Sequence, residues 1–347
     1  MATVALRRRT ETRVDRFSVL LIAFAAILWV SDAYFRNPLT KHLSASQIVV
    51  LEDALVALLL LPFLIRGLPE LRRLRPMRWL GVIVIGVGPQ ALATWLFTKS
   101  FAHQVFAVTY IAQQTQPLIA IALAWIILRE RRRPWFWPMA VVGMAGVYLV
   151  VFARDPLEPL ALLQGQGGAA AEVRLVAGLE ALGAAVLWAA GTVFGRYVLR
   201  DLSFRTTTAL RFLVALPVLI LIVLIESGPA GFTHYRLTDI VPNFLYIAIV
   251  PGFLGLLIYY RGLTSTPASL STIAELTLPV TIQLLASLPY PWGFGQPFYF
   301  PAQVIGTVLL LAVIVTLNWT KERNPPVLVE PEGWPEAFPQ AQKKLGT

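Results

Sequence analysis

Ten apolar segments, each close to the length that a helix needs to cross a bilayer, constrain the fold of this chain more than any other feature. They are residues 17–35, 46–65, 79–98, 105–128, 136–153, 175–195, 206–226, 240–260, 268–288 and 301–320. Most of the ninth segment and all of the tenth lie within a stretch of 45 residues, Leu276 to Thr320, that contains no Asp, Glu, Lys or Arg. No soluble helix or strand is that long without a charge. The sequence therefore predicts an all-α integral membrane protein with ten transmembrane helices.

The composition agrees with this prediction and argues against other classes of protein. Charged residues make up 14% of the chain, against about 25% in a soluble domain, so too few are present to cover a water-exposed surface. The hydrophobic content of 57% excludes intrinsic disorder. Because the sequence contains no cysteine, a disulfide framework, a thiolate metal site and a cysteine nucleophile are all excluded.

The distribution of basic residues predicts the orientation in the membrane. With the N-terminus inside the cell, the inside segments hold 22 of the 29 Lys and Arg residues, the outside loops hold six, and Arg211 lies within a span. This bias follows the positive-inside rule and predicts both termini on the cytoplasmic side of the cell membrane. We therefore interpret the basic clusters at 72–75 and 129–133 as topology signals beside the lipid bilayer and expect no nucleic-acid partner.

The first apolar segment has an alternative interpretation as a cleaved signal peptide. Three arginines at 7–9 precede it, and Ala23-Phe24-Ala25 fits an A-x-A cleavage site. Because the apolar run continues past that site to Phe35, we expect a retained transmembrane helix.

Internal repetition divides the chain into two halves. Leu28-Trp29 matches Leu187-Trp188 at an offset of 159 residues, and Pro89 matches Pro251 at an offset of 162. Each half contains five spans, an odd number, so the second half enters the membrane from the opposite side. The predicted fold is two inverted five-helix repeats, an architecture that secondary transporters often use for alternating access. The predicted organisation is a cytoplasmic N-terminal segment at 1–16, a first repeat at 17–155, a linker at 156–174, a second repeat at 175–320 and a flexible cytoplasmic tail at 321–347.

Several segments resemble a known family. They are AILW at 26–29, AQQTQPLIAIALAWIILRE at 112–130, PMAVVGMAGVYLVV at 138–151, AAVLWAAGTVF at 184–194 and AELTLPVTI at 274–282. Together with the two five-helix repeats, they resemble the EamA branch of the drug/metabolite transporter superfamily over about residues 17–320. The resemblance implies a transporter of small metabolites, including amino acids, that moves them mostly outward.

Two positions depart from the family pattern. The family often has an arginine early in the second helix of each repeat; Arg211 fits, but Glu52 occupies the equivalent place in the first repeat. An acidic turn, Arg129-Glu130, is present in the first repeat, whereas the second repeat has PYPWGFGQPFYF instead. Ligand chemistry and the outer gate are therefore expected to differ from those of better-known relatives.

Matching polar segments in spans four and nine predict a substrate site. Residues 111–117 align with 273–279 at the offset of 162, and both segments contain a proline. A proline inside a helix frees the carbonyl about four residues earlier, beside the polar side chain of Gln113 or Glu275. The alternative is that the prolines only kink the helices for packing. The predicted site residues are Gln113, Thr115, Glu275 and Thr277, with helix breaks at Pro117 and Pro279.

Trp29 and Trp188 are symmetry mates in the first helix of each half. An aromatic wall could stack on a planar or apolar substrate, which makes both candidates for the cavity lining. Membership of the interfacial aromatic belt is the alternative.

Charged residues inside the spans form a second group of candidates. Glu52 and Arg211 are symmetry-equivalent, so they could form an ion pair across the repeats, bind the two ends of a zwitterion, or take part in proton coupling together with Asp53. Asp32 is interpreted as a solvated helix end. Lys99 and its mate at position 261 are interpreted as snorkelling anchors, with gating as the alternative.

The predicted function is a secondary transporter that exports a small metabolite or amino acid by alternating access. The sequence has no P-loop for ATP, and no H-E-x-x-H or G-x-S-x-G motif, so we expect neither an enzyme nor a cofactor or metal. A channel or a membrane scaffold without carrier activity is the alternative. A homodimer is compatible with the sequence.

Overall fold

Six helices of the computed structural model are long and apolar enough to cross a membrane, and each lies on a predicted span. They are Phe17–Leu39, Ala45–Leu71, Pro76–Ala102, Leu175–Val198, Phe204–Ser227 and Val241–Leu263. The structure describes residues 16–103, 109, 112–113, 115–130, 134–151, 164, 168–233, 237–278, 280–281, 284 and 301–319, and none of these is in a strand. Over its described part the chain is therefore an all-helical, multi-pass membrane protein.

The described elements have the following bounds, where η1 and η3 are π-helices and η2 is a 3-10 helix. In chain order they are α1 (Arg16–Leu39), α2 (Ala45–Leu71), α3 (Pro76–Ile85), η1 (Gly86–Leu92), α4 (Ala93–Ala102), α6 (Gln116–Ile127), α7 (Phe136–Val151), α9 (Gly168–Val198), α10 (Phe204–Ser227), η2 (Pro229–Phe232), α11 (Leu237–Ile247), η3 (Ala248–Gly255), α12 (Leu256–Leu263), α13 (Ala268–Ala274) and α15 (Ala302–Trp319).

The other four predicted spans contain shorter helices. Over the described residues α6, α7, α13 and α15 have 12, 16, 7 and 18 residues. Parts of the predicted spans 105–128 and 268–288 lie outside the described residues. That the chain has ten membrane-spanning helices therefore stays a prediction. Six of the predicted spans are present as full-length helices.

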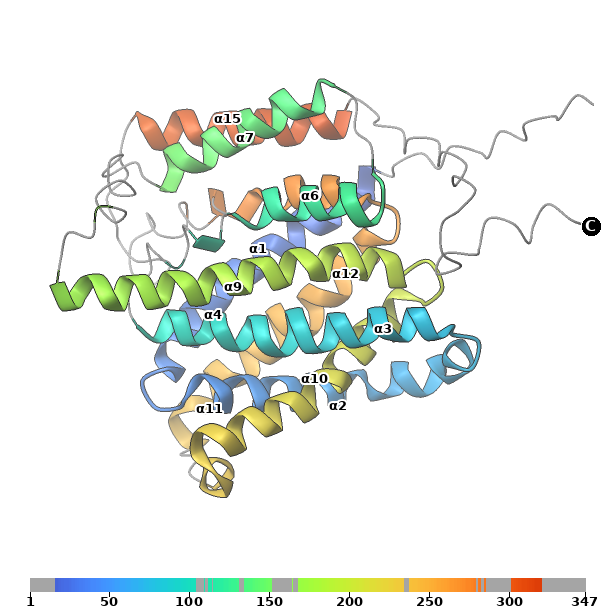
Figure 1. Ribbon diagram of the computed structural model, residues 1–347, viewed down its shortest axis with the longest axis vertical. Helices are drawn as coiled ribbons and strands as arrows, with labels where there is room; N and C mark the ends of the chain where they lie inside the picture. Colours follow the sequence, from blue (N-terminus) through green and yellow to red (C-terminus); the bar gives the residue numbers. More distant parts are fainter. Residues whose placement is uncertain are drawn as a thin grey trace, which may run out of the picture.

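The helices run side by side, and the two halves of the sequence interlock (Figure 1). In that view α7 and α15 form a pair along one edge, and α2, α10 and α11 lie along the opposite edge. The main contacts join the halves: α2 packs on α10, α4 and α6 pack on α9, and α1 packs on α12. Since neither half forms a bundle of its own, the centre of the molecule is built from both.

Matching serines begin the second helix of each half. Ser44 caps α2 in a capping box with Gln47, and Ser203 accepts a hydrogen bond from the backbone N–H of Thr206 at the start of α10. These side chains satisfy N–H groups that the first helical turn leaves unpaired. The two caps are 159 residues apart, which is the repeat offset found in the sequence.

Matching prolines interrupt the third helix of each half. Pro89 lies in η1, between α3 and α4, and Pro251 lies in η3, between α11 and α12. A proline has no N–H and clashes with the preceding turn, and a π-helical segment is a known local response at functional sites. Because the proline has no N–H, the carbonyl about four residues before it lacks its usual intrahelical donor.

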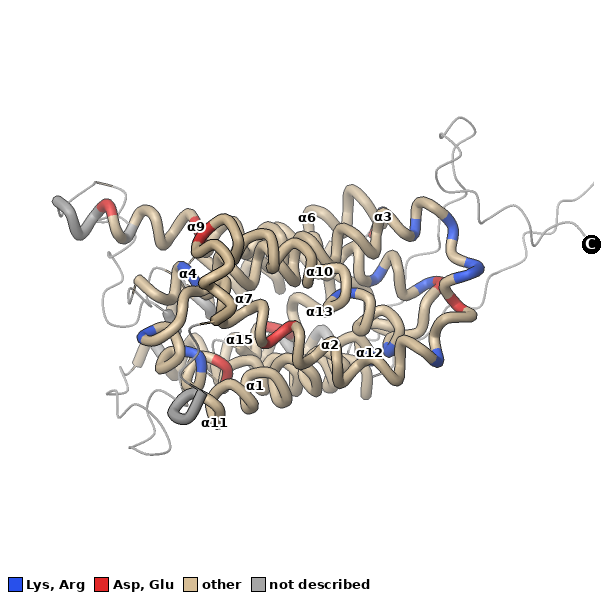
Figure 2. Tube along the Cα trace, turned by 90° about the horizontal axis from the view of Figure 1, so that it is seen from below, with Lys and Arg blue, Asp and Glu red and all other residues tan. Residues whose placement is uncertain are grey.

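Described Lys and Arg residues gather mainly at the end of the bundle where α3 begins and α12 ends (Figure 2). At that end Arg78 of the first half forms an ion pair with Asp201 of the second and donates to the Tyr197 carbonyl at 2.6 Å. The carboxylate of Glu70 accepts from the backbone N–H of Ser203 at 2.8 Å. The asymmetry of charge agrees with the positive-inside pattern of the sequence, and these contacts join the halves there.

The predicted linker at 156–174 is partly helical. α9 begins at Gly168, seven residues before the predicted start of the second repeat at 175. The added residues are GAAAEVR, and alanine is the strongest helix former, so they extend the helix beyond its apolar part. Apart from Gln164, the remaining linker residues lie outside the described residues, as do 1–15 and the predicted tail.

Gly262 is the point of closest approach between α12 and α1. A Cβ atom at this position would lie 2.6 Å from the Ser18 carbonyl oxygen and 2.7 Å from the Ile22 side chain. We expect Gly262→Ala to lower the free energy of unfolding by about 1–3 kcal/mol, because a backbone atom cannot give way as a side chain can. Thermal unfolding of the purified protein in detergent measures this loss.

Gly88→Ala is the matched control for that substitution. A Cβ at Gly88 would find its nearest neighbour, a Leu187 methyl group, at 3.5 Å, which is an ordinary contact. Unfolding temperatures that fall equally in both variants would contradict the close approach of α12 to α1.

Candidate functional site

A central cavity of about 170 Å³ lies between the two halves of the chain. Its walls come from α1, α2, η1, α4, Gln113 and α6 in the first half and from α9, α10, η3, α12 and the residues just after α13 in the second. Its charged and amide side chains are Asp32, Arg36, Glu52, Gln90, Gln113, Gln116, Arg211 and Glu275. Of the predicted residues, Trp29, Trp188, Glu52, Arg211, Gln113 and Glu275 line this cavity.

Two aromatic pairs line the cavity in a nearly symmetric arrangement. The Trp29 ring lies 5.0 Å from that of Tyr259, and the Trp188 ring lies 5.1 Å from that of Phe97. Trp29 and Trp188 are 159 residues apart, and Phe97 and Tyr259 are 162 apart, so each pair joins one half to the other at matching positions. Both tryptophans are half-buried and contribute to the cavity wall as predicted, rather than to an outer belt.

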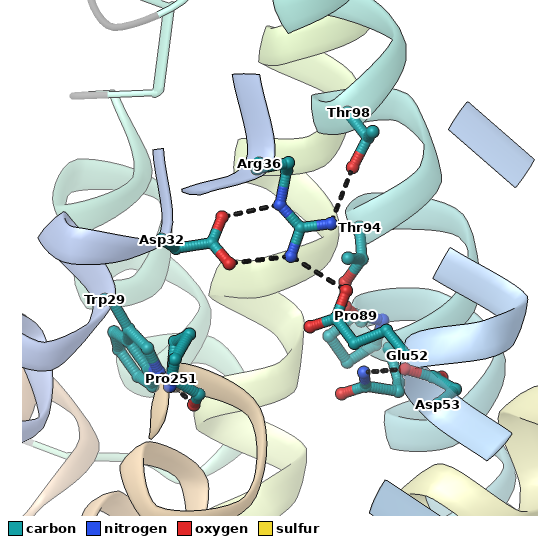
Figure 3. Close-up of polar contacts among 10 residues, drawn as sticks. Trp29, Asp32, Arg36, Glu52, Asp53, Pro89, Thr94, Thr98 and Pro251 are labelled. Atoms are coloured by element: carbon teal, nitrogen blue, oxygen red, sulfur yellow. Dashed lines mark hydrogen bonds and ion pairs between the residues drawn. The ribbon is translucent and has the colours of Figure 1, made fainter. Parts of the chain in front are cut away.

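Each of these tryptophans also donates a hydrogen bond to a proline carbonyl of the opposite half. Trp29 donates through Nε1 to the Pro251 carbonyl at 3.2 Å, and Trp188 donates to the Pro89 carbonyl at 3.0 Å. Figure 3 shows the first of these contacts. Both acceptors are carbonyls within the π-helical segments η1 and η3.

Glu275 is buried at the end of α13, where the helix turns. Its Oε1 accepts from the Tyr259 hydroxyl at 2.9 Å and its Oε2 from the Gln116 amide at 3.0 Å. The Tyr259 hydroxyl also contacts the hydroxyl of Thr192 at 2.9 Å. The carboxylate is thus held by neutral donors.

Gln113, the mate of Glu275, also faces the cavity. Its buried side-chain Oε1 has no hydrogen-bond partner among the described residues. A buried acceptor without a partner costs free energy, so its retention at a cavity is typical of a position that a ligand fills.

Both polar segments contain non-helical residues in the described part of the chain, and the threonine hydroxyls there bind backbone carbonyls. Residues 112–113 are helical, Thr115 is a turn, and α6 starts at Gln116 with Pro117 in its first turn. The Thr115 hydroxyl donates to the Ala112 carbonyl at 2.7 Å, and Thr277 donates to the Ala274 carbonyl at 3.0 Å.

Neither threonine is among the described residues that line the cavity, and both hydroxyls satisfy backbone carbonyls at the breaks, so their role as substrate ligands stays a prediction. Pro279 lies outside the described residues.

Arg36 forms a buried ionic cluster at one end of the cavity (Figure 3). Its guanidinium donates through Nε and Nη2 to both Asp32 oxygens, at 2.5 and 2.8 Å, and through Nη2 to Glu52 at 2.8 Å. A longer contact of 3.4 Å reaches Thr98. The Arg36 residue is only 3% exposed, so one buried cation binds two carboxylates.

Three sequence interpretations are corrected by this cluster. Arg36 is not in an outside loop, because α1 continues to Leu39 and buries it. Asp32 is not a solvated helix end, because it binds Arg36. Glu52 pairs with Arg36 rather than with Arg211. A guanidinium has five donors, enough to satisfy both acids at once.

Arg211 and Asp53 are joined through an amide rather than directly. Arg211 donates through Nε to Gln90 Oε1 at 2.7 Å, and Gln90 donates through Nε2 to Asp53 Oδ1 at 2.9 Å. Arg211 also donates to the Tyr260 hydroxyl at 3.1 Å. Asp53 is fully buried behind Gln90, and its Oδ2 has no partner among the described residues. The Gln90 amide therefore binds both charged groups, Arg211 through its oxygen and Asp53 through its nitrogen.

Several residues of the cavity were not predicted from the sequence. Gln90 follows the matched Pro89, which was the available signal, and Gln116 lies in the segment AQQTQP that was singled out for Gln113. Phe97 and Tyr259 match at the offset of 162, so the repeat was the available signal for them too.

Lys99 takes part in an ionic contact between the halves. It forms an ion pair with Glu180 of α9 at 3.1 Å, and His103 contacts the other oxygen of Glu180 at 3.1 Å. Its mate Arg261 is exposed and contacts only the neighbouring Thr264 and the Phe204 ring among the described residues. The snorkelling interpretation therefore fits Arg261 better than Lys99. Among the described residues, no group of three or more His, Asp or Glu is placed to hold a metal.

A comparison with known protein families finds a family model that matches both halves of the chain. The model described as the EamA-like transporter family matches residues 16–152 and again residues 176–319. The two matches correspond closely to the two halves between which the cavity lies.

Two curated proteins are similar to the chain. The riboflavin transporter ImpX of Fusobacterium nucleatum is 26% identical over 310 residues, which cover 86% of this chain and 96% of the relative. The uncharacterized transporter YwfM of Bacillus subtilis is 26% identical over 212 residues, 60% of this chain and 63% of the relative. A solved structure, described only as the crystal structure of a protein, superposes with a TM-score of 0.66 at 20% identity, covering 88% of this chain and 98% of the other, and shares the fold.

Proposed function

Because the chain belongs to the EamA-like transporter family, we propose that it is a secondary transporter that moves a small molecule by alternating access. In this proposal the two halves are inverted repeats in the cell membrane, both termini are cytoplasmic, and net transport is outward. The substrate is a small metabolite or an amino acid.

The observation that carries this proposal is the central cavity with its paired aromatic contacts. Both halves line the cavity, and each contributes one tryptophan that bonds to the other half's proline carbonyl. If the halves exchange conformations, each tryptophan takes the place of its mate and the cavity opens to the opposite side. A membrane scaffold has no need for a polar cavity built from two repeats.

The aromatic pairs support a substrate with a planar ring. Their rings flank the cavity, and aromatic groups stack at comparable centroid distances. The relative ImpX is named a riboflavin transporter, and a flavin contains a planar ring system. A planar ring compound is thus the second candidate beside an aliphatic metabolite.

Counterflow in proteoliposomes tests the proposal. A carrier loaded with unlabelled substrate takes up labelled substrate against its gradient, whereas a channel does not. We expect Trp29→Phe and Trp188→Phe each to lower the exchange rate about 2- to 10-fold, because each loses one hydrogen bond of about 0.5–1.5 kcal/mol between the halves. Trp79→Phe, near the start of α3 and outside the cavity lining, is the control that keeps the wild-type rate.

A further inference from the structure

Some charged groups around the central cavity have an oppositely charged partner and others do not, and this difference indicates a class of substrate. We propose that the cavity binds a small ring-bearing amine in its cationic form and discriminates against the same ring carrying a carboxylate. This inference rests on the proposed transporter function and specifies its substrate. It follows from three observations: the occupied arginines, the unpaired carboxylate and the aromatic walls.

Both arginines of the cavity already serve protein groups. Arg36 is shared between Asp32 and Glu52, so this cluster carries one negative charge more than positive when all three groups are ionised. Arg211 donates a hydrogen bond to Gln90, and Gln90 in turn donates one to Asp53. At Arg36 a substrate carboxylate would have to compete with two acids that are already bound. At Arg211 the direct partners are the neutral Gln90 and the Tyr260 hydroxyl, and the buried Asp53 lies behind Gln90.

Glu275, in contrast, has no cationic partner. No described Lys, Arg or His forms an ion pair with it, and its two donors, Tyr259 and Gln116, are neutral. A buried carboxylate that lines a cavity without a countercharge attracts a cation or a proton into that cavity. The charged residues among the described lining are three acids and two arginines, so this lining favours a positive ligand.

The remaining lining groups complete a site for an amine attached to a ring. The unpartnered Oε1 of Gln113 offers a second acceptor for an ammonium N–H. Tryptophan and tyrosine faces attract cations, and the pairs Trp29–Tyr259 and Trp188–Phe97 provide them in the same cavity. A cavity of about 170 Å³ is smaller than the roughly 300–1,000 Å³ of sites for drug-sized ligands, which restricts the ring system to a small one.

Three ligands with one ring and different charges test the proposal. Tryptamine is a cation, tryptophan a zwitterion and indole-3-propionate an anion at pH 7, and the purified protein in detergent is titrated with each while its unfolding temperature is followed. We expect tryptamine to bind at least about 10-fold more tightly than the other two. Equal or tighter binding of tryptophan or indole-3-propionate would overturn the charge assignment, and so would the absence of binding by all three.

Substitutions then assign the preference to the named groups. Glu275→Gln is expected to weaken tryptamine binding about 10- to 100-fold, and Gln113→Leu about 3- to 10-fold. Glu172→Gln, an exposed glutamate of α9, is the control that keeps the wild-type affinity. If Glu275→Gln does not fold, the Gln113→Leu variant and the ranking of the three ligands by the wild-type protein still decide whether the cavity binds the cationic amine. Unchanged tryptamine affinity in folded variants would overturn the site.

The failure of this inference is distinguishable from failure of the transporter proposal. Counterflow of any metabolite by the wild-type protein supports the carrier irrespective of the ligand ranking. If the protein exchanged tryptophan or a neutral ring compound better than tryptamine, the transporter proposal would stand and only the proposed substrate class would be overturned.

Discussion

The Arg36→Gln variant is expected to lose about 3–5 kcal/mol of folding free energy, more than any other single substitution among the residues of the cavity. Arg36 is buried and is the cation within hydrogen-bond distance of both Asp32 and Glu52. Glutamine preserves most of the side-chain length but removes the charge, which leaves two carboxylates close together in a low-dielectric environment. The unfolding temperature in detergent, and the fraction of protein that elutes as a single species after heating, measure the loss.

Removing the acids together with the arginine is expected to restore stability. The triple variant Asp32→Asn, Glu52→Gln, Arg36→Gln contains no uncompensated charge in this cluster, so its unfolding temperature should lie well above that of Arg36→Gln alone. Arg261→Gln, an exposed arginine at the end of α12, is the matched control and is expected to change stability little. A triple variant no more stable than the single one would contradict the ionic role.

The Gln90→Leu variant is expected to have the second largest effect on stability. Gln90 is 3% exposed, and its amide is the connection between Arg211 and Asp53. Leucine has a similar volume but neither donates nor accepts, so one buried guanidinium and one buried carboxylate each lose a partner. Lost hydrogen bonds to charged groups cost about 1.5–3 kcal/mol each, and thermal unfolding should show a loss of about 3 kcal/mol for the two together.

Gln113→Leu is the matched control for this substitution, because it removes another amide from the same cavity. The Oε1 of Gln113 has no partner among the described residues, so its replacement leaves no described acceptor unpaired. We expect it to leave stability unchanged or slightly raised while it lowers ligand affinity. If Gln90→Leu were as stable as Gln113→Leu, the amide between Arg211 and Asp53 would not be needed for the fold.

The long apolar helices were predictable because a bilayer restricts the backbone strongly. A membrane-spanning segment needs about 20 apolar residues in a helix, so length and hydropathy together locate it. Six of the ten predicted spans are confirmed at full length. The spans around 113–117 and 275–279 are harder to delimit, since a proline and polar side chains break the helix there.

The membership of the cavity was partly predictable from the repeat. Trp29 and Trp188 were singled out because they match across the halves, and the structure places both in the cavity wall. Gln113 and Glu275 were found for the same reason. Matching positions in two halves that enclose one cavity lie on equivalent faces, so symmetry selects residues that composition cannot.

The pairing of the charges was decided by the tertiary structure alone. The sequence offered Glu52 and Arg211 as partners because they are equivalent by symmetry, whereas Glu52 binds Arg36 and Arg211 reaches Asp53 through Gln90. An ion pair depends on distances of a few ångströms between side chains from different helices, and these are fixed by how the helices pack.

By itself, then, the sequence determined the membrane class, the repeat and the helices, because these follow from local hydropathy and from matches along the chain. The tertiary structure decided which carboxylate is paired with a cation and which is bound by neutral donors. Glu52, Asp53 and Glu275 are alike in the sequence as acids within spans, and only their neighbours in space distinguish them. Electrostatic compensation is a property of the packed helices, and no pattern along one chain contains it.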